Sequence, residues 1–167
     1  MLIRQLRADE GLAYRDIRLR ALREAPHAFA ATFEEESAQP ETFWVDLIAR
    51  TAKAMEAALF VAERDDRTLG GTAFVRVSPE PPHGGSVGAM WVDEDLRGSG
   101  AADALLEAAE RFALALGSSE ITLWVSDSNP PARRFYERNG YVATGVAERQ
   151  TSGITALMML KPIDRYR

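Results

Sequence analysis

The sequence predicts a single α/β domain built on a mixed β-sheet that is flanked by about four helices. A strand-like run at Ser86–Val92 precedes small residues and an amphipathic helix pattern at Ser99–Leu116, and β-forming residues return at Glu120–Val125. Elements in this order form a right-handed βαβ unit with a parallel strand pair. With 167 residues, 46% of them hydrophobic and 27% charged, the chain (1–167) has the size and composition of one globular domain.

The first half of the chain is expected to contribute two helices and three strands, defined by hydrophobic periodicity and breaking residues. In order these are a strand at Leu2–Leu6, a helix at Ala8–Arg23 that Pro26 ends, a helix at Glu41–Ala52, a strand at Ala58–Ala62 and a strand at Thr68–Val77. Gly70 and Gly71 indicate a β-bulge in the last strand, and Pro79–Gly85 is expected to be a loop.

The second half is anchored by the helix at Ser99–Leu116, which has the clearest pattern in the chain. One face is apolar, the other carries an i,i+4 pair of Glu107 with Arg111, and Gly117 supplies the stop. The elements expected after it are the strand at Glu120–Val125, a short helix at Pro131–Arg138, a break at Gly140, and strands at Tyr141–Glu148 and Thr155–Leu160.

Composition argues against several classes of function. The chain has no cysteine, which rules out disulfides, thiolate metal ligands and a cysteine nucleophile. Its two histidines, His27 and His83, are expected at the surface, so no metal site is predicted. The net charge of −5 argues against non-specific nucleic-acid binding. No apolar run is long enough for a signal peptide core or a membrane span, so we expect a cytoplasmic protein without membrane contact.

The turn Arg97-Gly98-Ser99-Gly100-Ala101-Ala102 is the most informative segment. Glycines let the backbone approach a ligand closely, and the free N–H groups of the first helical turn, aided by the helix dipole, form an anion site. Arg97 adds a cation at its mouth. The segment therefore predicts a phosphate-bearing cofactor held at a helix N-terminus.

With a second motif in view, the chain resembles the GNAT superfamily of acyl-CoA-dependent N-acetyltransferases. The family's cofactor motif, Arg/Gln-x-x-Gly-x-Gly/Ala, fits Arg97, Gly100 and Ala102. Its second motif, Asn-x-x-Ala-x-x-x-Tyr followed by Gly and an aromatic residue, is matched by residues 129–136 and then 140–141. The resemblance implies a GNAT-like fold in which residues 86–141 form the cofactor-binding core and the N-terminal half forms the acceptor side.

The resemblance implies acetyl-CoA as the acyl donor, without a metal. The pyrophosphate would lie on the backbone amides of Gly98, Ser99, Gly100, Ala101 and Ala102, with Arg97 beside it. The pantetheine arm would lie where the strand before the loop separates from its parallel neighbour. The residues implied for the arm and its groove are Met90, Trp91, Val92, Asn129, Ala132, Phe135 and Tyr136, and Arg138 is the expected further contact with phosphate.

Two catalytic contributions follow from the same resemblance. The backbone N–H near Met90 would polarise the thioester carbonyl, and the Tyr136 hydroxyl would lie by the sulfur and support the leaving thiolate. Many relatives carry a glutamate base on the strand before the loop, but Ser86–Val92 contains no carboxylate. The candidates elsewhere are Glu34, Glu35, Glu36 and Asp127, and direct attack assisted by ordered water stays open.

The acceptor side is less defined by the sequence. Candidate substrate-binding residues are Phe29, Phe33, Glu35, Trp91 and Trp124, although the aromatic residues are equally compatible with core packing. The acidic run Glu34–Glu36 is compatible with a solvated helix end or with a wall that attracts a cationic acceptor.

The sequence thus predicts an acetyl-CoA-dependent N-acetyltransferase that acts on a small-molecule primary amine by direct transfer in a ternary complex. The acceptor classes are an antibiotic or toxin, a polyamine and an amino acid. The alternatives are a protein N-terminus or lysine as acceptor, a non-catalytic acyl-CoA-binding module, and a nucleotide-binding domain, which would lack the P-loop lysine. A homodimer is also expected, with Ile154–Leu160 as a strand that could pair subunits.

Overall fold

A computed structural model describes residues 1–80 and 84–163 of the chain. Its strands are β1 (Leu2–Gln5), β2 (Ala57–Glu63), β3 (Leu69–Val77), β4 (Gly85–Val92), β5 (Glu120–Ser126), β6 (Val142–Arg149) and β7 (Thr155–Pro162). Its helices are α1 (Gly11–Glu24), α2 (Phe33–Ser37), α3 (Glu41–Lys53), α4 (Ala101–Ala115) and α5 (Pro130–Arg138), with short 3-10 turns η1 (Pro26–Ala28) and η2 (Glu94–Leu96). The mixed α/β architecture predicted from the sequence is confirmed.

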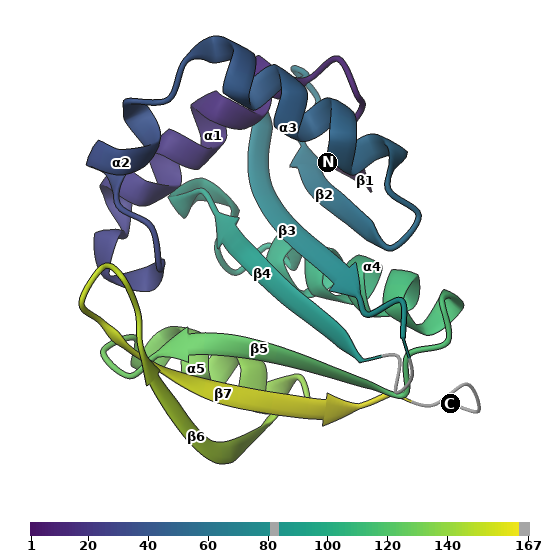
Figure 1. Cartoon of the computed structure of the whole chain (residues 1–167), viewed down its shortest axis with the longest axis vertical. Coiled ribbons are helices and arrows are strands. Elements are labelled where there is room, and N and C mark those ends of the chain that lie inside the picture. Colours follow the sequence, from purple (N-terminus) through teal and green to yellow (C-terminus); the bar gives the residue numbers. More distant parts are fainter. Residues whose placement is uncertain (81–83, 164–167) are drawn as a thin grey trace.

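The strands form one seven-stranded sheet in the order β1-β2-β3-β4-β5-β7-β6 (Figure 1). All neighbours are antiparallel except β4 and β5, which are joined through α4 as the predicted βαβ unit. This parallel pair is short, because only Gly85–Val87 of β4 pair with Ile121–Leu123 of β5. Beyond Val87 the two strands separate, and Figure 1 shows the sheet opening there.

A β-bulge lies in β4 just beyond the point of separation. The register against β3 shifts between Thr72 and Phe74, and Ala89 has a φ of 48°, which is unusual for a residue with a Cβ. The buried Thr72 hydroxyl donates a hydrogen bond of 2.7 Å to the Ala89 carbonyl oxygen. The Thr72 side chain on β3 therefore holds the backbone of β4 in this conformation.

Two helical layers cover the sheet. On one face, α1 and α3 enclose a core that includes Ile17, Leu22, Trp44 and Ile48. On the other face, the apolar side of α4 packs against β2, β3 and β4, and Tyr136 of α5 joins the same core. The opening between β4 and β5 therefore has helices on both sides of the sheet.

The close approach of α1 to α3 depends on Gly11. A Cβ added at Gly11 would lie 2.6 Å from the Val45 Cα and 2.7 Å from the Trp44 carbonyl oxygen. These are backbone atoms, so the clash would force the two helices apart. Gly11 thus lets α1 and α3 form one layer over the sheet.

Several details differ from the sequence-based expectation. The structure has five α-helices rather than about four, because Thr32 and Glu35 form a capping box that starts the short helix α2. The helix expected from Ser99 begins at Ala101, since Gly100 adopts a left-handed conformation. The bulge expected at Gly70-Gly71 is confirmed, because Gly70 has no register partner on β2. His83 and part of the expected loop at Pro79–Gly85 lie outside the described residues.

One expectation about subunit pairing was wrong. The apolar C-terminal strand was expected to help pair subunits, but β7 lies between β5 and β6 and both of its edges are already hydrogen-bonded. Its apolar composition reflects this internal position. The homodimer itself stays a prediction.

In the described part of the chain, no helix combines the length and apolarity that a bilayer span requires.

We expect Gly11→Ala to destabilise the protein by about 1–3 kcal/mol, the usual range for overpacking. The matched control is Gly88→Ala, because a Cβ there meets nothing within 4 Å. Urea unfolding of both variants measures the free energy of unfolding. An unchanged stability of Gly11→Ala, or an equal loss in both variants, would contradict the close α1–α3 contact.

Candidate active site

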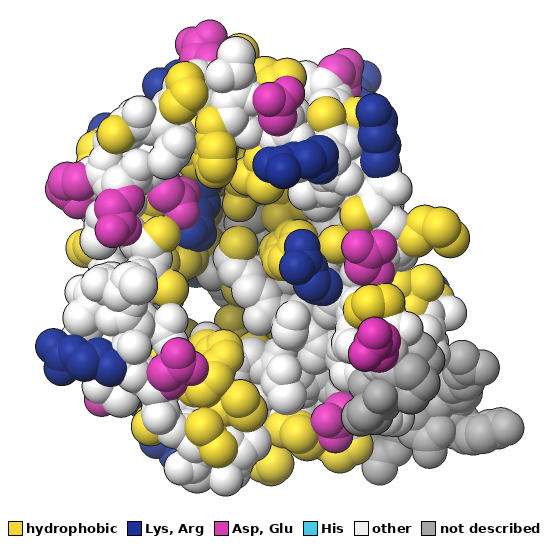
Figure 2. Space-filling model, viewed as in Figure 1, with side chains coloured by type: hydrophobic (Ala, Val, Ile, Leu, Met, Phe, Trp, Pro, Cys, Tyr) yellow, Lys and Arg dark blue, Asp and Glu magenta, His cyan; other side chains and the backbone are white. Residues whose placement is uncertain are grey.

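A cleft of about 720 Å³ opens where β4 leaves β5. Figure 2 shows this face of the molecule hollowed between helices α1–α3 and strands β5–β7. The cleft is lined by the end of α1 and η1, the end of β4, the loop before α4, and α5. Its lining residues are Glu24, Ala25, His27, Met90, Trp91, Val92, Arg97, Gly98, Gly100, Ala102, Asp103, Asn129, Pro131, Ala132, Phe135, Tyr136 and Arg138.

The loop before α4 has the geometry of an anion cradle. Gly98 and Gly100 have φ values of +77° and +88°, and a Cβ at either position would project into open space. The N–H groups of these two glycines have no acceptor among the described residues, and the N-terminus of α4 has no side-chain cap. Free N–H groups at a helix start favour a bound anion. A pyrophosphate therefore fits this part of the cleft.

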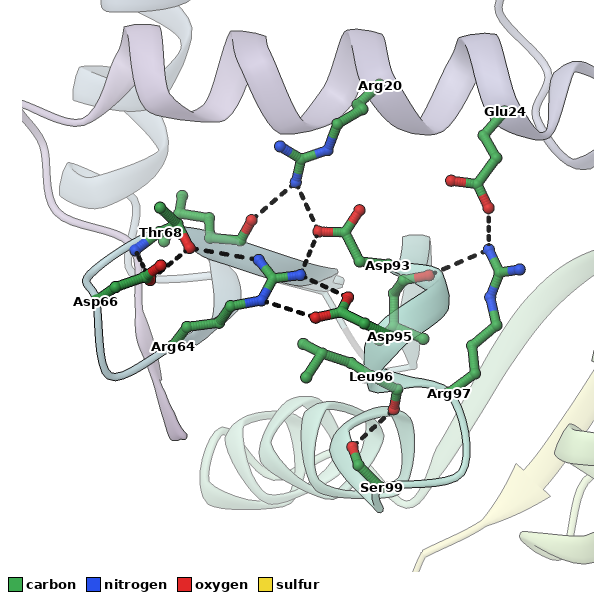
Figure 3. Close-up of polar contacts among 12 residues, drawn as sticks. Arg20, Glu24, Arg64, Asp66, Thr68, Asp93, Asp95, Leu96, Arg97 and Ser99 are labelled. Atoms are coloured by element: carbon green, nitrogen blue, oxygen red, sulfur yellow. Dashed lines mark hydrogen bonds and ion pairs between the residues drawn. The ribbon is translucent and has the colours of Figure 1, made fainter.

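Arg97 closes one side of the cradle. Its guanidinium forms an ion pair with Glu24 at the end of α1 and donates a hydrogen bond of 3.3 Å to the Val92 carbonyl oxygen (Figure 3). The cation expected at the mouth of the anion site is therefore already neutralised by a carboxylate. An incoming phosphate would compete with Glu24 for Arg97.

A network of ion pairs holds the segment between β4 and this loop. Arg64 Nη2 lies 2.7 Å from Asp93 Oδ2 and 2.7 Å from Asp95 Oδ1, and Arg20 Nη2 donates to Asp93 Oδ2 at 2.8 Å (Figure 3). The hydrogen bond from Arg64 holds the pKa of Asp95 below its usual range. The network ties α1 and the β2–β3 turn to η2, so it positions the residues that enter the cradle.

The opposite wall is α5, whose N-terminus is capped by Asn129. Asn129 Oδ1 accepts a hydrogen bond of 3.3 Å from the Ala132 backbone, which leaves the Nδ2 donors for other partners. Arg138 at the other end of the helix pairs with Asp103 at 3.2 Å and lies over the Phe135 ring. Asp103 would otherwise place an unpaired negative charge in the first turn of α4.

Tyr136 is the buried polar group of this wall. It is 7% exposed, its ring packs against Tyr141, and its hydroxyl has no hydrogen-bond partner among the described side chains. Burial raises the pKa of Tyr136 well above its ordinary value of about 10. The phenol therefore stays protonated, and its hydroxyl is available as a donor in the cleft.

A second pocket of about 230 Å³ lies between the α1–α3 layer and the sheet. It meets the β4 bulge at Ala89, next to Met90 of the large cleft. Its lining residues are Tyr14, Arg18, Glu36, Phe43, Trp44, Leu47, Ile48, Thr51, Leu59, Phe74 and Ala89. Consecutive residues of β4 thus line the two pockets.

Most of the residues predicted to bind the cofactor line the large cleft, and two do not. Ala101 is fully buried, and Ser99 turns its hydroxyl to the Leu96 carbonyl at 2.6 Å. Both are nevertheless part of the cradle's backbone, and their role toward a cofactor stays a prediction.

The predicted substrate-binding residues are spread more widely. Trp91 lines the large cleft beneath Arg20, whereas Phe29, Phe33, Glu35 and Trp124 line neither pocket. Glu35 accepts a hydrogen bond from the Thr32 backbone at 3.0 Å. Phe29 and Phe33 belong to one hydrophobic cluster with α1 and α3, and Trp124 and Glu35 lie outside it.

The carboxylates considered as a general base lie in different parts of the structure. Glu34 and Asp127 are exposed and line neither pocket, whereas Glu36 lines the smaller one and binds Arg18 through both oxygens at 2.8 and 2.9 Å. Glu36 is therefore the candidate that the fold places beside a pocket.

Among residues 1–80 and 84–163, no group of three or more carboxylates and histidines could hold a metal ion.

Sequence reasoning missed the part of the site that the first helix contributes. Glu24, Ala25 and His27 line the large cleft, and Tyr14 and Arg18 line the small pocket. No local motif marks these residues, because long-range packing of α1 and α3 brings them to the site. The charge of Glu24 opposite Arg97 carries no sequence signal either.

Comparison with known proteins places this architecture in a family. Mycothiol acetyltransferase from Thermomonospora curvata is 32% identical over 127 residues, which are 76% of this chain and 39% of that protein. The chain thus aligns with well under half of the relative's length.

Solved structures share the fold over nearly the whole chain. The acetyltransferase of GNAT family from Streptococcus pneumoniae has a TM-score of 0.80 and 17% identity, and covers 98% of this chain and 99% of its own. The yncA protein from Salmonella typhimurium, solved with its cofactor acetyl-CoA, has a TM-score of 0.79 and 14% identity, and covers 100% and 96%. The sequence profile of the Acetyltransferase (GNAT) family matches residues 17–141, and the chain is a member of this family.

Proposed function

We propose that this chain transfers the acetyl group of acetyl-CoA to the primary amine of a small molecule, in the cytoplasm and by direct attack in a ternary complex. The observation that supports this best is the joining of two features at one cleft. The gap between β4 and β5 begins beyond Val87, and the glycine cradle before α4 lies at the end of the same cleft. A long thiol cofactor with a pyrophosphate needs both.

The proposed placement of the donor uses the shape of the cleft. The pyrophosphate would lie on the N–H groups around Gly98 and Gly100, and the pantetheine arm would run along Met90 and Val92 toward the bulge. The Nδ2 donors of Asn129 would bind the arm, since its Oδ1 caps α5. Ala132 and Phe135 would form the apolar side of the groove.

When bound, acetyl-CoA supplies an activated acetyl group and a thiolate leaving group. The chain's own task is to hold a donor near the carbonyl oxygen and another near the sulfur. The Met90 N–H at the bulge is the proposed oxyanion donor. The Tyr136 hydroxyl is the proposed donor to sulfur. A thiol has a pKa of about 8.5, far below that of buried Tyr136, so the phenol stabilises the thiolate by a hydrogen bond and keeps its proton.

The amine must lose a proton before it attacks, because an alkylamine has an unperturbed pKa of about 10.4. With no carboxylate on β4, we propose that water in the open cleft carries this proton away. Glu36 is the alternative base, although its two oxygens bind Arg18.

The alternative functions share this fold and differ in the acceptor or in whether acetyl transfer takes place. A small-molecule acceptor is supported by the pocket of about 230 Å³ beside the bulge, whose volume suits the body of a small amine. The Thermomonospora relative is a mycothiol acetyltransferase, which also supports an acceptor other than a protein. A non-catalytic acyl-CoA-binding module would not need the unpartnered Tyr136 hydroxyl in the cleft.

The test of the function is thiol release from acetyl-CoA across a panel of primary amines, with acetyl-CoA binding followed by thermal shift. We expect acetyl-CoA to raise the melting temperature and one class of amine to trigger release. Binding without release from any amine or protein acceptor would favour the binding module. Stronger stabilisation by ATP or NAD than by acetyl-CoA would overturn the proposal.

We expect Gly100→Ala to weaken CoA binding by about tenfold or more, because its Cβ would project into the cradle and the left-handed φ would be strained. The matched control is Gly145→Ala on β6, where the glycine also has a positive φ and open space. Both changes carry the same backbone strain, but only the first alters the cradle. Isothermal titration calorimetry with CoA compares them, and equal affinities would argue against pyrophosphate at this loop.

We expect Tyr136→Phe to lower kcat by about 100-fold with little change in CoA affinity, which is the usual size of the effect when a hydrogen-bond donor to a developing negative charge is lost. Tyr141→Phe is the control, because the neighbouring Tyr141 hydroxyl donates to Glu110 outside the cleft. That change should leave kcat unaltered. A Tyr136→Phe variant with full activity would remove Tyr136 from the mechanism.

A further inference from the structure

The small pocket beside the β4 bulge has an apolar and largely aromatic wall. Phe43 and Trp44 of α3 meet edge to face with their ring centroids 5.3 Å apart, and Tyr14 of α1 lies 6.0 Å from Trp44. Phe74 and Leu59 complete the wall from the sheet side. Hydrophobic side chains gather in the hollow below the helices in Figure 2. Such a wall favours a ligand with an apolar body.

The pocket has room for such a body at the bulge. Its volume is about 230 Å³, whereas a cavity of about 150 Å³ suffices for benzene. Ala89 lines the pocket at the bulge. Because Met90, the next residue, lines the large cleft, a ligand that fills the pocket as far as Ala89 would have one end beside the proposed reaction centre.

The charges at the pocket cancel. Arg18 and Glu36 are the charged residues among its lining side chains, and they form a bidentate ion pair with side chains 13% and 20% exposed. Of the acidic run, Glu35 belongs to the capping box of α2, and Glu34 is exposed and does not line the pocket. The pocket therefore offers no unpaired carboxylate to a second ammonium group, and burying an unpaired charge is strongly unfavourable.

One polar atom in the wall has no partner. The Trp44 side chain is 1% exposed, and its Nε1 has no hydrogen-bond acceptor among the described residues. This atom has almost no exposed surface, so a ligand in the pocket cannot reach it, and the wall around the pocket is predominantly apolar.

We infer that the acceptor is a monoamine with an apolar body of about one aromatic ring, which fills this pocket while its amine lies at Ala89. The inference rests on the proposed function and narrows it, because a polyamine or a polycationic antibiotic would place a second ammonium against the aromatic wall. The acidic run is then a structural feature of α2 rather than a cation-attracting surface.

Binding to the CoA-saturated protein tests the inference without turnover. We expect 2-phenylethylamine to bind at least tenfold more tightly than ethylamine, which lacks the body, and than spermidine, which has further ammonium groups. Isothermal titration calorimetry measures all three affinities. Spermidine binding as tightly as 2-phenylethylamine would overturn the inference.

Variants that fill the pocket provide a second test of this inference. Leu47→Trp should abolish 2-phenylethylamine binding and leave CoA binding intact, whereas Leu116→Trp at the exposed end of α4 should change neither. If Leu47→Trp does not fold, Thr51→Met adds volume to the same lining. Undiminished amine binding in the folded filling variant would place the amine elsewhere.

An acetylation assay with the same amines distinguishes a failure of this inference from a failure of the proposed function. If 2-phenylethylamine binds as expected but no amine is acetylated, the function fails and the pocket assignment stands. If amines are acetylated but spermidine is preferred over 2-phenylethylamine, the function stands and the assignment of an apolar monoamine is wrong.

Discussion

The early end of the parallel pairing between β4 and β5 is the constraint on which the rest of the site depends. Once the strands part beyond Val87, β4 has free backbone groups on the side that faces the gap. The Thr72 hydroxyl then fixes the bulge at Ala89 from the buried side of β3. A gap with a fixed edge can receive an extended ligand, whereas a continuous ladder cannot.

Each end of this gap is shaped by a different kind of interaction. At the cradle, the ion pairs of Arg64 and Arg20 with Asp93 hold the chain that leads to Gly98. At the bulge, aromatic packing between α1 and α3 forms the wall of the small pocket. Charge therefore organises the end suited to phosphate, and apolar packing organises the end proposed for the acceptor.

The sequence was sufficient for the βαβ unit because its signals are local: the periodicity of α4, the glycines before it, and the strand-forming residues of β5. It was not sufficient for the acceptor side. Tyr14 and Arg18 of α1 are far from Trp44 of α3 in the sequence, and they meet it only because Gly11 lets α1 approach α3. Likewise, the pairing of Glu24 with Arg97 and the internal position of β7 arise from tertiary contacts that no short motif encodes.

A crystal structure of the chain with CoA would show whether the gap between β4 and β5 holds the cofactor. We expect the pantetheine arm in this gap, the pyrophosphate on the amides of residues 98–102, and the sulfur near the Tyr136 hydroxyl. We also expect Arg97 to exchange Glu24 for phosphate. CoA bound outside the gap, or with its pyrophosphate away from the glycine loop, would contradict the proposed site.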